Sequence, residues 1–87
     1  MRLQKNKQVI FMTVKIYSTE WCHFCKEAKK FFKENDIKFT EIDVGKDQEA
    51  AEEMVEKSGQ MGVPVIDING EIIVGFDRNK IKKALKI

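Results

Sequence analysis

The two cysteines of this chain, Cys22 and Cys25, lie two residues apart in the segment Trp21-Cys22-His23-Phe24-Cys25. If Cys22 opens a helix, its sulfur lies where unpaired backbone N–H groups and the positive end of the helix dipole converge. That environment favours the thiolate, the form of cysteine that attacks disulfides. Cys25 would lie one turn later on the same side of the helix, within reach of the first sulfur. The pair therefore predicts thiol–disulfide exchange, with Cys22 as the nucleophile and the more buried Cys25 as the resolving thiol.

Other uses of the two thiols stay open at this point. They could simply pack in the core, or they could bind a metal. A structural zinc site needs about four ligands, whereas Cys22, Cys25 and His23 offer three, so no metal is expected within one chain. A metal or iron–sulfur cluster bridging two chains would make the protein a non-catalytic binding module instead. His23 is either an exposed residue between the cysteines or a partly protonated imidazole that stabilises the thiolate.

A strand is expected before the cysteines and a helix after them. Residues 13–17 alternate apolar and polar side chains and are rich in β-branched residues, which is typical of a strand. Residues 22–35 carry apolar residues at helical spacing, which predicts a helix with one face against a sheet. The residues of that predicted stripe are Phe24, Ala28, Phe31 and Phe32.

The rest of the chain predicts two further helices and three further strands. Because Asn69-Gly70 accommodates the positive φ angles of a type I′ turn, it predicts a hairpin. The first strand–helix–strand unit predicts a right-handed parallel crossover. The order is therefore β-α-β-α-β-β-α, with strands at 39–44, 63–68 and 71–75, a helix at 46–58, and a last helix from Asp77 onward.

Size and composition limit the possible classes of protein. With 87 residues, 43% of them hydrophobic and 34% charged, the chain is expected to be one globular domain over residues 12–87, preceded by a basic and frayed extension at residues 1–11. A net charge of +2 gives no indication of nucleic-acid binding. No apolar run reaches the roughly 20 residues that span a membrane, and no secretory signal is recognised. A single close cysteine pair favours the cytoplasm, where it can cycle between dithiol and disulfide. The protein is expected to be a monomer.

Four features together carry a family resemblance: the C-x-x-C after the first strand, Val63-Pro64 opening the third, the hairpin, and Gly75-Phe76-Asp77 before the last helix. The combination resembles the thioredoxin fold and is similar to its glutaredoxin-like branch over about Met12 to Leu85. The resemblance implies an α/β thioredoxin fold, in which three helices flank a central four-stranded mixed sheet. It also implies an enzyme, a thiol–disulfide oxidoreductase acting on disulfide-bearing proteins or small disulfides, with no bound cofactor.

The resemblance assigns roles to residues around the cysteines. In that family the proline corresponding to Pro64 is cis and lies against the sulfurs, and the backbone of the preceding residue, here Val63, pairs with an extended substrate. Residues next to the thiols form the docking rim, and residues before the last helix hold one end of glutathione. In this chain the rim residues are Trp21, His23 and Phe24, and the residues before the last helix are Gly75, Phe76 and Asp77.

The chain departs from the pattern of glutathione-fed members. A lysine is usual three residues before the first cysteine, whereas this chain has Thr19 there, followed by Glu20, which would repel a carboxylate. Of the usual Gly-Gly-x-Asp-Asp stretch only Asp77 keeps its carboxylate, because Arg78 replaces the second acid. Gly75-Phe76 is also similar to donors that serve ribonucleotide reductase and are recharged by thioredoxin reductase. The reductant is therefore left open between glutathione, as a co-substrate, and a flavoenzyme of the thioredoxin-reductase type.

Overall fold

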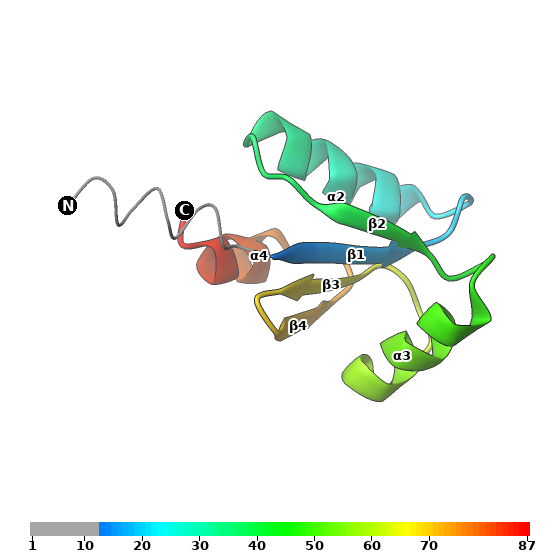
Figure 1. Cartoon of the computed structure of the whole chain (residues 1–87). Helices are drawn as coiled ribbons and strands as arrows, with labels where there is room; N and C mark the ends of the chain where they lie inside the picture. Colours follow the sequence, from blue (N-terminus) through cyan, green and yellow to red (C-terminus); the bar gives the residue numbers. More distant parts are fainter. Residues whose placement is uncertain (1–12) are drawn as a thin grey trace.

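The computed structural model describes residues 13–87 (Figure 1). Met12 and the extension expected at residues 1–11 lie outside the described residues. The observed order is β-α-β-α-β-β-α, as the sequence predicts. The elements are β1 Val14–Ser18, α2 His23–Glu34, β2 Thr40–Asp43, α3 Gln48–Ser58, β3 Val65–Ile68, β4 Glu71–Val74 and α4 Arg78–Leu85.

The four strands form one mixed sheet in the order β2-β1-β3-β4. β1 and β2 are parallel, which confirms the predicted crossover, while β3 is antiparallel to both β1 and β4. The register places Ser18 beside Asp43 and Tyr17 beside Val65. The segments that follow β1 and β2 and the segment that precedes β3 therefore meet at the same end of the sheet.

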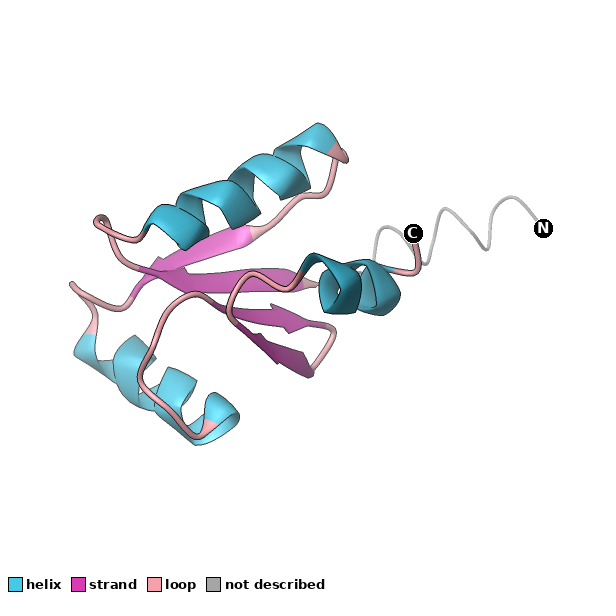
Figure 2. Ribbon diagram, turned by 180° about the vertical axis from the view of Figure 1, so that it is seen from behind, coloured by secondary structure: helices cyan, strands magenta, loops and turns pink. Residues whose placement is uncertain are grey.

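Helices cover both faces of the sheet, so that it has two separate cores (Figure 1). α2 and α4 share one face, where Phe32 and Ile81 pack with apolar residues of β1, β3 and β4. α3 covers the other face, where Met54 packs against Tyr17 and Val65. Figure 2 shows the same arrangement from behind, with the four strands between α2 and α3.

Local signals read from the sequence place the ends of several elements. Asp77 is the N-cap of α4, and its carboxylate accepts the Lys80 N–H. Gly59 ends α3 in the left-handed conformation at φ 75°. Asn69 and Gly70 have φ 53° and 94°, the two positive values of the predicted turn.

Most predicted boundaries differ from the observed ones by one or two residues, and three of the differences have a clear local reason. α2 starts at His23 rather than Cys22, because Cys22 has an extended backbone and caps the helix with its side chain. α3 starts at Gln48 rather than residue 46, because Asp47 is its cap. β3 starts at Val65 rather than residue 63, because Pro64 has no N–H to donate to a neighbouring strand.

Candidate active site

Cys22 is the N-cap of α2, so its sulfur lies at the positive end of the helix. Its backbone is extended, with φ −83° and ψ 113°, and its Sγ accepts the N–H of Cys25 at 3.1 Å. The side chain is partly exposed, and the thiol is free. A backbone N–H aimed at the sulfur, together with the helix dipole, stabilises negative charge on that atom. The sequence places this residue at the right end of the helix, and its capping role comes from the structure.

Cys25 lies one turn further along α2 and is fully buried. Burial raises the pKa of the Cys25 thiol to about 12, and its side-chain hydrogen bond with Cys22 acts in the same direction. The backbone N–H of Thr19 and the charge of Lys29 act against these effects without cancelling them. Cys25 is therefore a neutral thiol at physiological pH when both cysteines are reduced.

Two exposed apolar side chains flank Cys22 in the sequence or nearly so, and a third lies two residues before Val63. Trp21 is 87% exposed, Phe24 60% and Met61 80%. The prediction that Phe24 begins the buried stripe of α2 is wrong, since Cys25 is the buried residue of the first turn. Phe31 points to the same side of the helix as Phe24, two turns later, but the Phe76 ring covers it at 6.1 Å. The ring contact of Phe24 is instead with exposed His23, at 5.7 Å.

The loops before β3 and after β4 are tied together at the sulfur end of the sheet. The Gly75 N–H donates to the Pro64 carbonyl at 2.8 Å, and Val65 pairs with Val74. The Val63–Pro64 peptide bond is cis, and Pro64 is buried while Val63 is partly exposed. Because Val65 lies beside Tyr17, Val63 and Pro64 lie next to the segment that leads to Cys22. Within residues 13–87, no hydrogen bond involves the backbone N–H or C=O of Val63.

The remaining predicted site residues have structural roles of their own. Phe76 is partly buried and packs against the core formed by α2, α4 and the sheet. Asp77 caps α4, as described above. The His23 side chain is 77% exposed, and its Nε2 lies 3.9 Å from Glu27, the next residue on that face of α2. The sheet register, by contrast, brings the Val63–Pro64 loop next to the segment that leads to Cys22.

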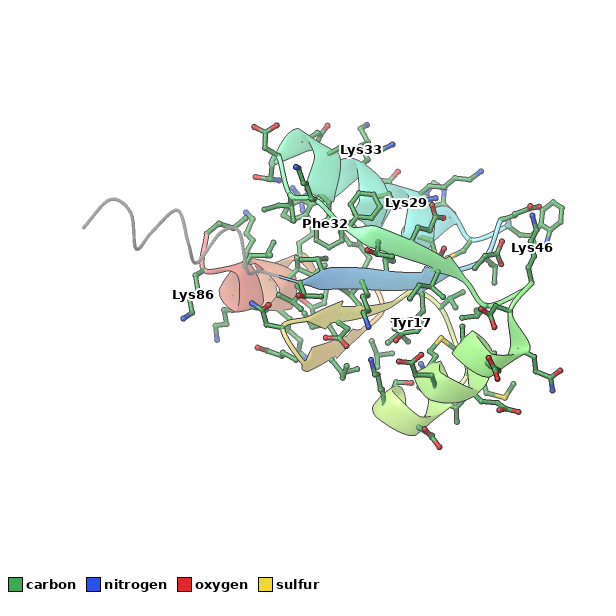
Figure 3. All side chains as sticks on the ribbon, in the orientation of Figure 1. Tyr17, Lys29, Phe32, Lys33, Lys46 and Lys86 are labelled. Carbon is green, nitrogen blue, oxygen red and sulfur yellow. The ribbon has the colours of Figure 1, made fainter. Side chains whose placement is uncertain are left out.

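Sequence reasoning missed a polar network beside Cys25. Ser18, the last residue of β1, is buried, and its hydroxyl donates to Glu41 at 3.0 Å. Lys29 of α2 donates to the same carboxylate oxygen at 2.7 Å (Figure 3). The hydrogen bond from Lys29 is the main cause that lowers the pKa of Glu41. The network connects β1, β2 and α2 close to the cysteines, and no sequence signal joins Glu41 to partners 12 and 23 residues away.

A second missed contact involves Glu20. Lys46, from the loop after β2, lies 2.7 Å from the Glu20 carboxylate (Figure 3). The Lys46 ammonium group therefore lies close to Thr19 and Glu20, where the sequence alone offers no cation. The ion pair borders a hollow of about 220 Å³ next to the exposed Trp21 ring, also lined by Asp43 and Gly45.

Two further observations concern the described residues as a whole. Over residues 13–87 no three His, Cys, Asp or Glu side chains are gathered in the manner of a metal site. The three helices in that range are too short and too polar to cross a membrane.

Comparison with known proteins places the chain in a family. Residues 14–73 match the glutaredoxin family model. The chain is 45% identical over 73 residues to an uncharacterized glutaredoxin-like 8.6 kDa protein in the rubredoxin operon of Clostridium pasteurianum, a match that covers 84% of this chain and 97% of the relative. It is 33% identical to the glutaredoxin-like protein NrdH of Lactococcus lactis subsp. cremoris, over 80% of this chain and 96% of the relative.

A solved structure gives the same fold. A variant of the thioredoxin-like protein BC3987 superposes with a TM-score of 0.81 at 29% identity, covering 86% of this chain and 96% of that protein. The predicted thioredoxin fold, with three helices around a four-stranded mixed sheet, is confirmed.

Proposed function

This chain belongs to the glutaredoxin family, and from that membership we propose that it is a dithiol thiol–disulfide oxidoreductase. Its substrates are disulfides of proteins or of small molecules. The observation that carries the proposal is the geometry of the two cysteines. The Cys22 sulfur caps α2 and accepts the Cys25 N–H at 3.1 Å, while the second thiol is buried directly behind it.

In the first step the Cys22 thiolate attacks one sulfur of the target disulfide. A bond forms between Cys22 and that sulfur, and the other target sulfur leaves as a thiolate that takes up a proton. Cys25 then loses its proton and attacks the Cys22 sulfur, and the second target sulfur leaves. The target has gained two electrons and two protons, and the chain carries a Cys22–Cys25 disulfide that an external reductant reopens.

The backbone of Val63 is proposed to hold the substrate during this exchange. Its N–H and C=O are free of hydrogen bonds within residues 13–87, and it lies beside the segment leading to Cys22. An extended substrate segment can pair with such a backbone as an added strand. The exposed rings of Trp21 and Phe24, close to Cys22 in the sequence, are proposed to supply apolar contact with the substrate.

The reductant is proposed to be glutathione or a flavoenzyme of the thioredoxin-reductase type. The glutathione site is partial, since Thr19 and Arg78 replace residues that the family uses for it, while Gly75-Phe76 is similar to donors recharged by thioredoxin reductase. The two are distinguished by reducing one disulfide substrate either with glutathione and glutathione reductase or with thioredoxin reductase. The protein is proposed to act as a monomer in the cytoplasm.

Cysteine variants test the mechanism. Cys22→Ser should abolish disulfide reduction, whereas Cys25→Ser should accumulate a mixed disulfide with the target, visible by mass spectrometry. If both variants keep the wild-type turnover, the mechanism is wrong. An absorbance spectrum of freshly purified protein tests the alternative of a metal- or cluster-bridged binding module, which would show a visible band.

A further inference from the structure

The outer face of α2 carries a stripe of four lysines, Lys26, Lys29, Lys30 and Lys33, called here the α2 lysine stripe. Together with Glu34 these side chains line an open hollow of about 490 Å³. Lys26, Lys30 and Lys33 are exposed, while Lys29 is partly buried beside β2. Figure 3 shows Lys29 and Lys33 on the same side of α2. The stripe therefore presents several positive charges on one surface of a single helix.

The stripe is aligned with the nucleophilic sulfur. A helix turns about 100° per residue, so Lys26, Lys29 and Lys33 project within about 40° of the direction of Cys22. With a rise of about 1.5 Å per residue, the stripe extends about 16 Å from Cys22 to Lys33. An extended peptide advances about 3.3 Å per residue, so about five residues would cover that length.

Most of this positive charge is uncompensated. Lys29 is paired with Glu41 at 2.7 Å. Within residues 13–87 the side chains of Lys26, Lys30 and Lys33 form no ion pair. Residues 1–12 contain no Asp or Glu that could supply one. Three cations therefore remain available for an anionic partner: Lys26 and Lys33 are in line with the Cys22 sulfur, and Lys30 lies about 80° around the helix from it.

We propose that the α2 lysine stripe is a docking surface for an acidic peptide segment adjoining the disulfide of the substrate protein. An acidic segment of about five residues would lie along α2 and bring its disulfide to Cys22. This rests on the function proposed above and adds the substrate class. Complementary charge of this kind mainly raises the rate of productive encounter.

The distribution of charge favours a protein segment over nucleic acid. Three of the 16 basic residues and none of the 14 acids lie in residues 1–12, and the net charge of the whole chain is only +2. Residues 13–87 are therefore slightly acidic as a unit, and most of their basic side chains gather in two local groups, the stripe and α4. A protein that wraps a phosphate backbone instead presents a broad basic surface.

The test uses two synthetic peptides, each containing one internal disulfide followed by five glutamates or by five glutamines. The pre-reduced full chain is mixed with each peptide in single-turnover experiments, and the peptide thiols formed are measured after quenching. The variants are Lys26→Gln/Lys30→Gln/Lys33→Gln and, as a matched control, Lys80→Gln/Lys82→Gln/Lys83→Gln. The control removes the same charge from α4, which lies at the opposite end of the sheet from the loop between β1 and α2 (Figure 1).

The wild type should reduce the glutamate peptide about 10-fold faster than the glutamine peptide at low ionic strength, and the ratio should approach one in high salt. The α2 variant should lose this preference and the α4 variant should keep it. Equal rates with the two wild-type peptides would overturn the proposal, and so would a ratio that both variants keep or both lose.

If neither peptide is reduced, the oxidoreductase assignment fails, and docking is then decided by binding alone. A cysteine-free glutamate peptide should bind the wild type at least about fivefold more tightly than the α2 variant, because three favourable charges are lost. Equal affinities would overturn the docking surface. Tighter binding of a single-stranded oligonucleotide than of this peptide would also overturn it, in favour of a nucleic-acid surface.

Discussion

Burial of Cys25 makes the stability of the reduced protein depend on alkaline pH. In the folded chain burial, followed by the hydrogen bond with Cys22, raises the thiol pKa from 9.0 to about 12. Between these values the unfolded chain releases the proton of this thiol while the folded chain keeps it. The contribution of Cys25 to stability is therefore fully present below about pH 9 and is lost as the pH rises towards about 12.

The size of the effect follows from the difference between the two pKa values. Each pH unit above the pKa of Cys25 in the unfolded chain lowers the free energy of unfolding by about 1.4 kcal/mol. Moving from about pH 7.5 to about pH 10.5 should therefore lower it by about 2 kcal/mol through Cys25 alone. Cys25→Ser removes the titrating group but keeps Tyr17 and Lys57, whose pKa values are also raised. The loss on going to alkaline pH should therefore be about 2 kcal/mol larger in the wild type than in the variant.

The measurement is urea unfolding followed by far-ultraviolet circular dichroism, with a phosphine reductant keeping the thiols reduced. Fluorescence is a poor probe, because Trp21 is already 87% exposed in the folded chain. Equal pH dependence of the wild type and Cys25→Ser would refute the reasoning, since it would mean that Cys25 titrates alike in the folded and unfolded chains. In that case a neutral, buried resolving thiol would also have to be abandoned.

Three further predictions concern other parts of the chain. Lys57→Met removes hydrogen bonds to Asp67 at 3.0 Å and to a buried tyrosine hydroxyl at 3.1 Å. It should lower the free energy of unfolding by about 2 kcal/mol in urea titrations. Lys46→Met, at an exposed ion pair, is the control, and an equal loss of stability in that variant would contradict the role of burial. Asp77→Ala removes the N-cap of α4 and should cost about 1 kcal/mol in the same assay, whereas an unchanged midpoint would show that the cap is dispensable. Thr19→Lys supplies the cation that glutathione-fed relatives carry and should raise the glutathione-coupled rate about fivefold; an unchanged rate would mean that glutathione does not use this position.

Much of the fold could be predicted because its signals are local. The cap at Asp77, the left-handed stop at Gly59 and the turn at Asn69-Gly70 each depend on a few neighbouring residues. The predicted element order was correct because apolar spacing distinguishes helices from strands over one or two turns. The spacing of the two cysteines predicted their place at the start of a helix by the same local rule.

Which side chains are buried at the N-terminal end of α2 could not be predicted in this way. Helical spacing favours Phe24 as a buried residue, since it projects to the same side as Phe31. Phe31 is buried because Phe76 and Arg78 from a distant segment cover it, at 6.1 and 5.5 Å. At the first turn the buried residue is Cys25, so burial there depends on tertiary contacts that helical spacing does not contain.

The sequence by itself determined the order of the elements, the caps and turns that bound them, and the place of Cys22 at the start of a helix, because each depends on energies within a few residues. Only the tertiary structure decided that Cys25 is sealed from solvent with a strongly raised pKa, that Glu41 joins Ser18 to Lys29, and that Glu20 is paired with Lys46. Desolvation and ion pairing depend on which distant segments the sheet register brings together, and a linear pattern of residue types does not specify that register.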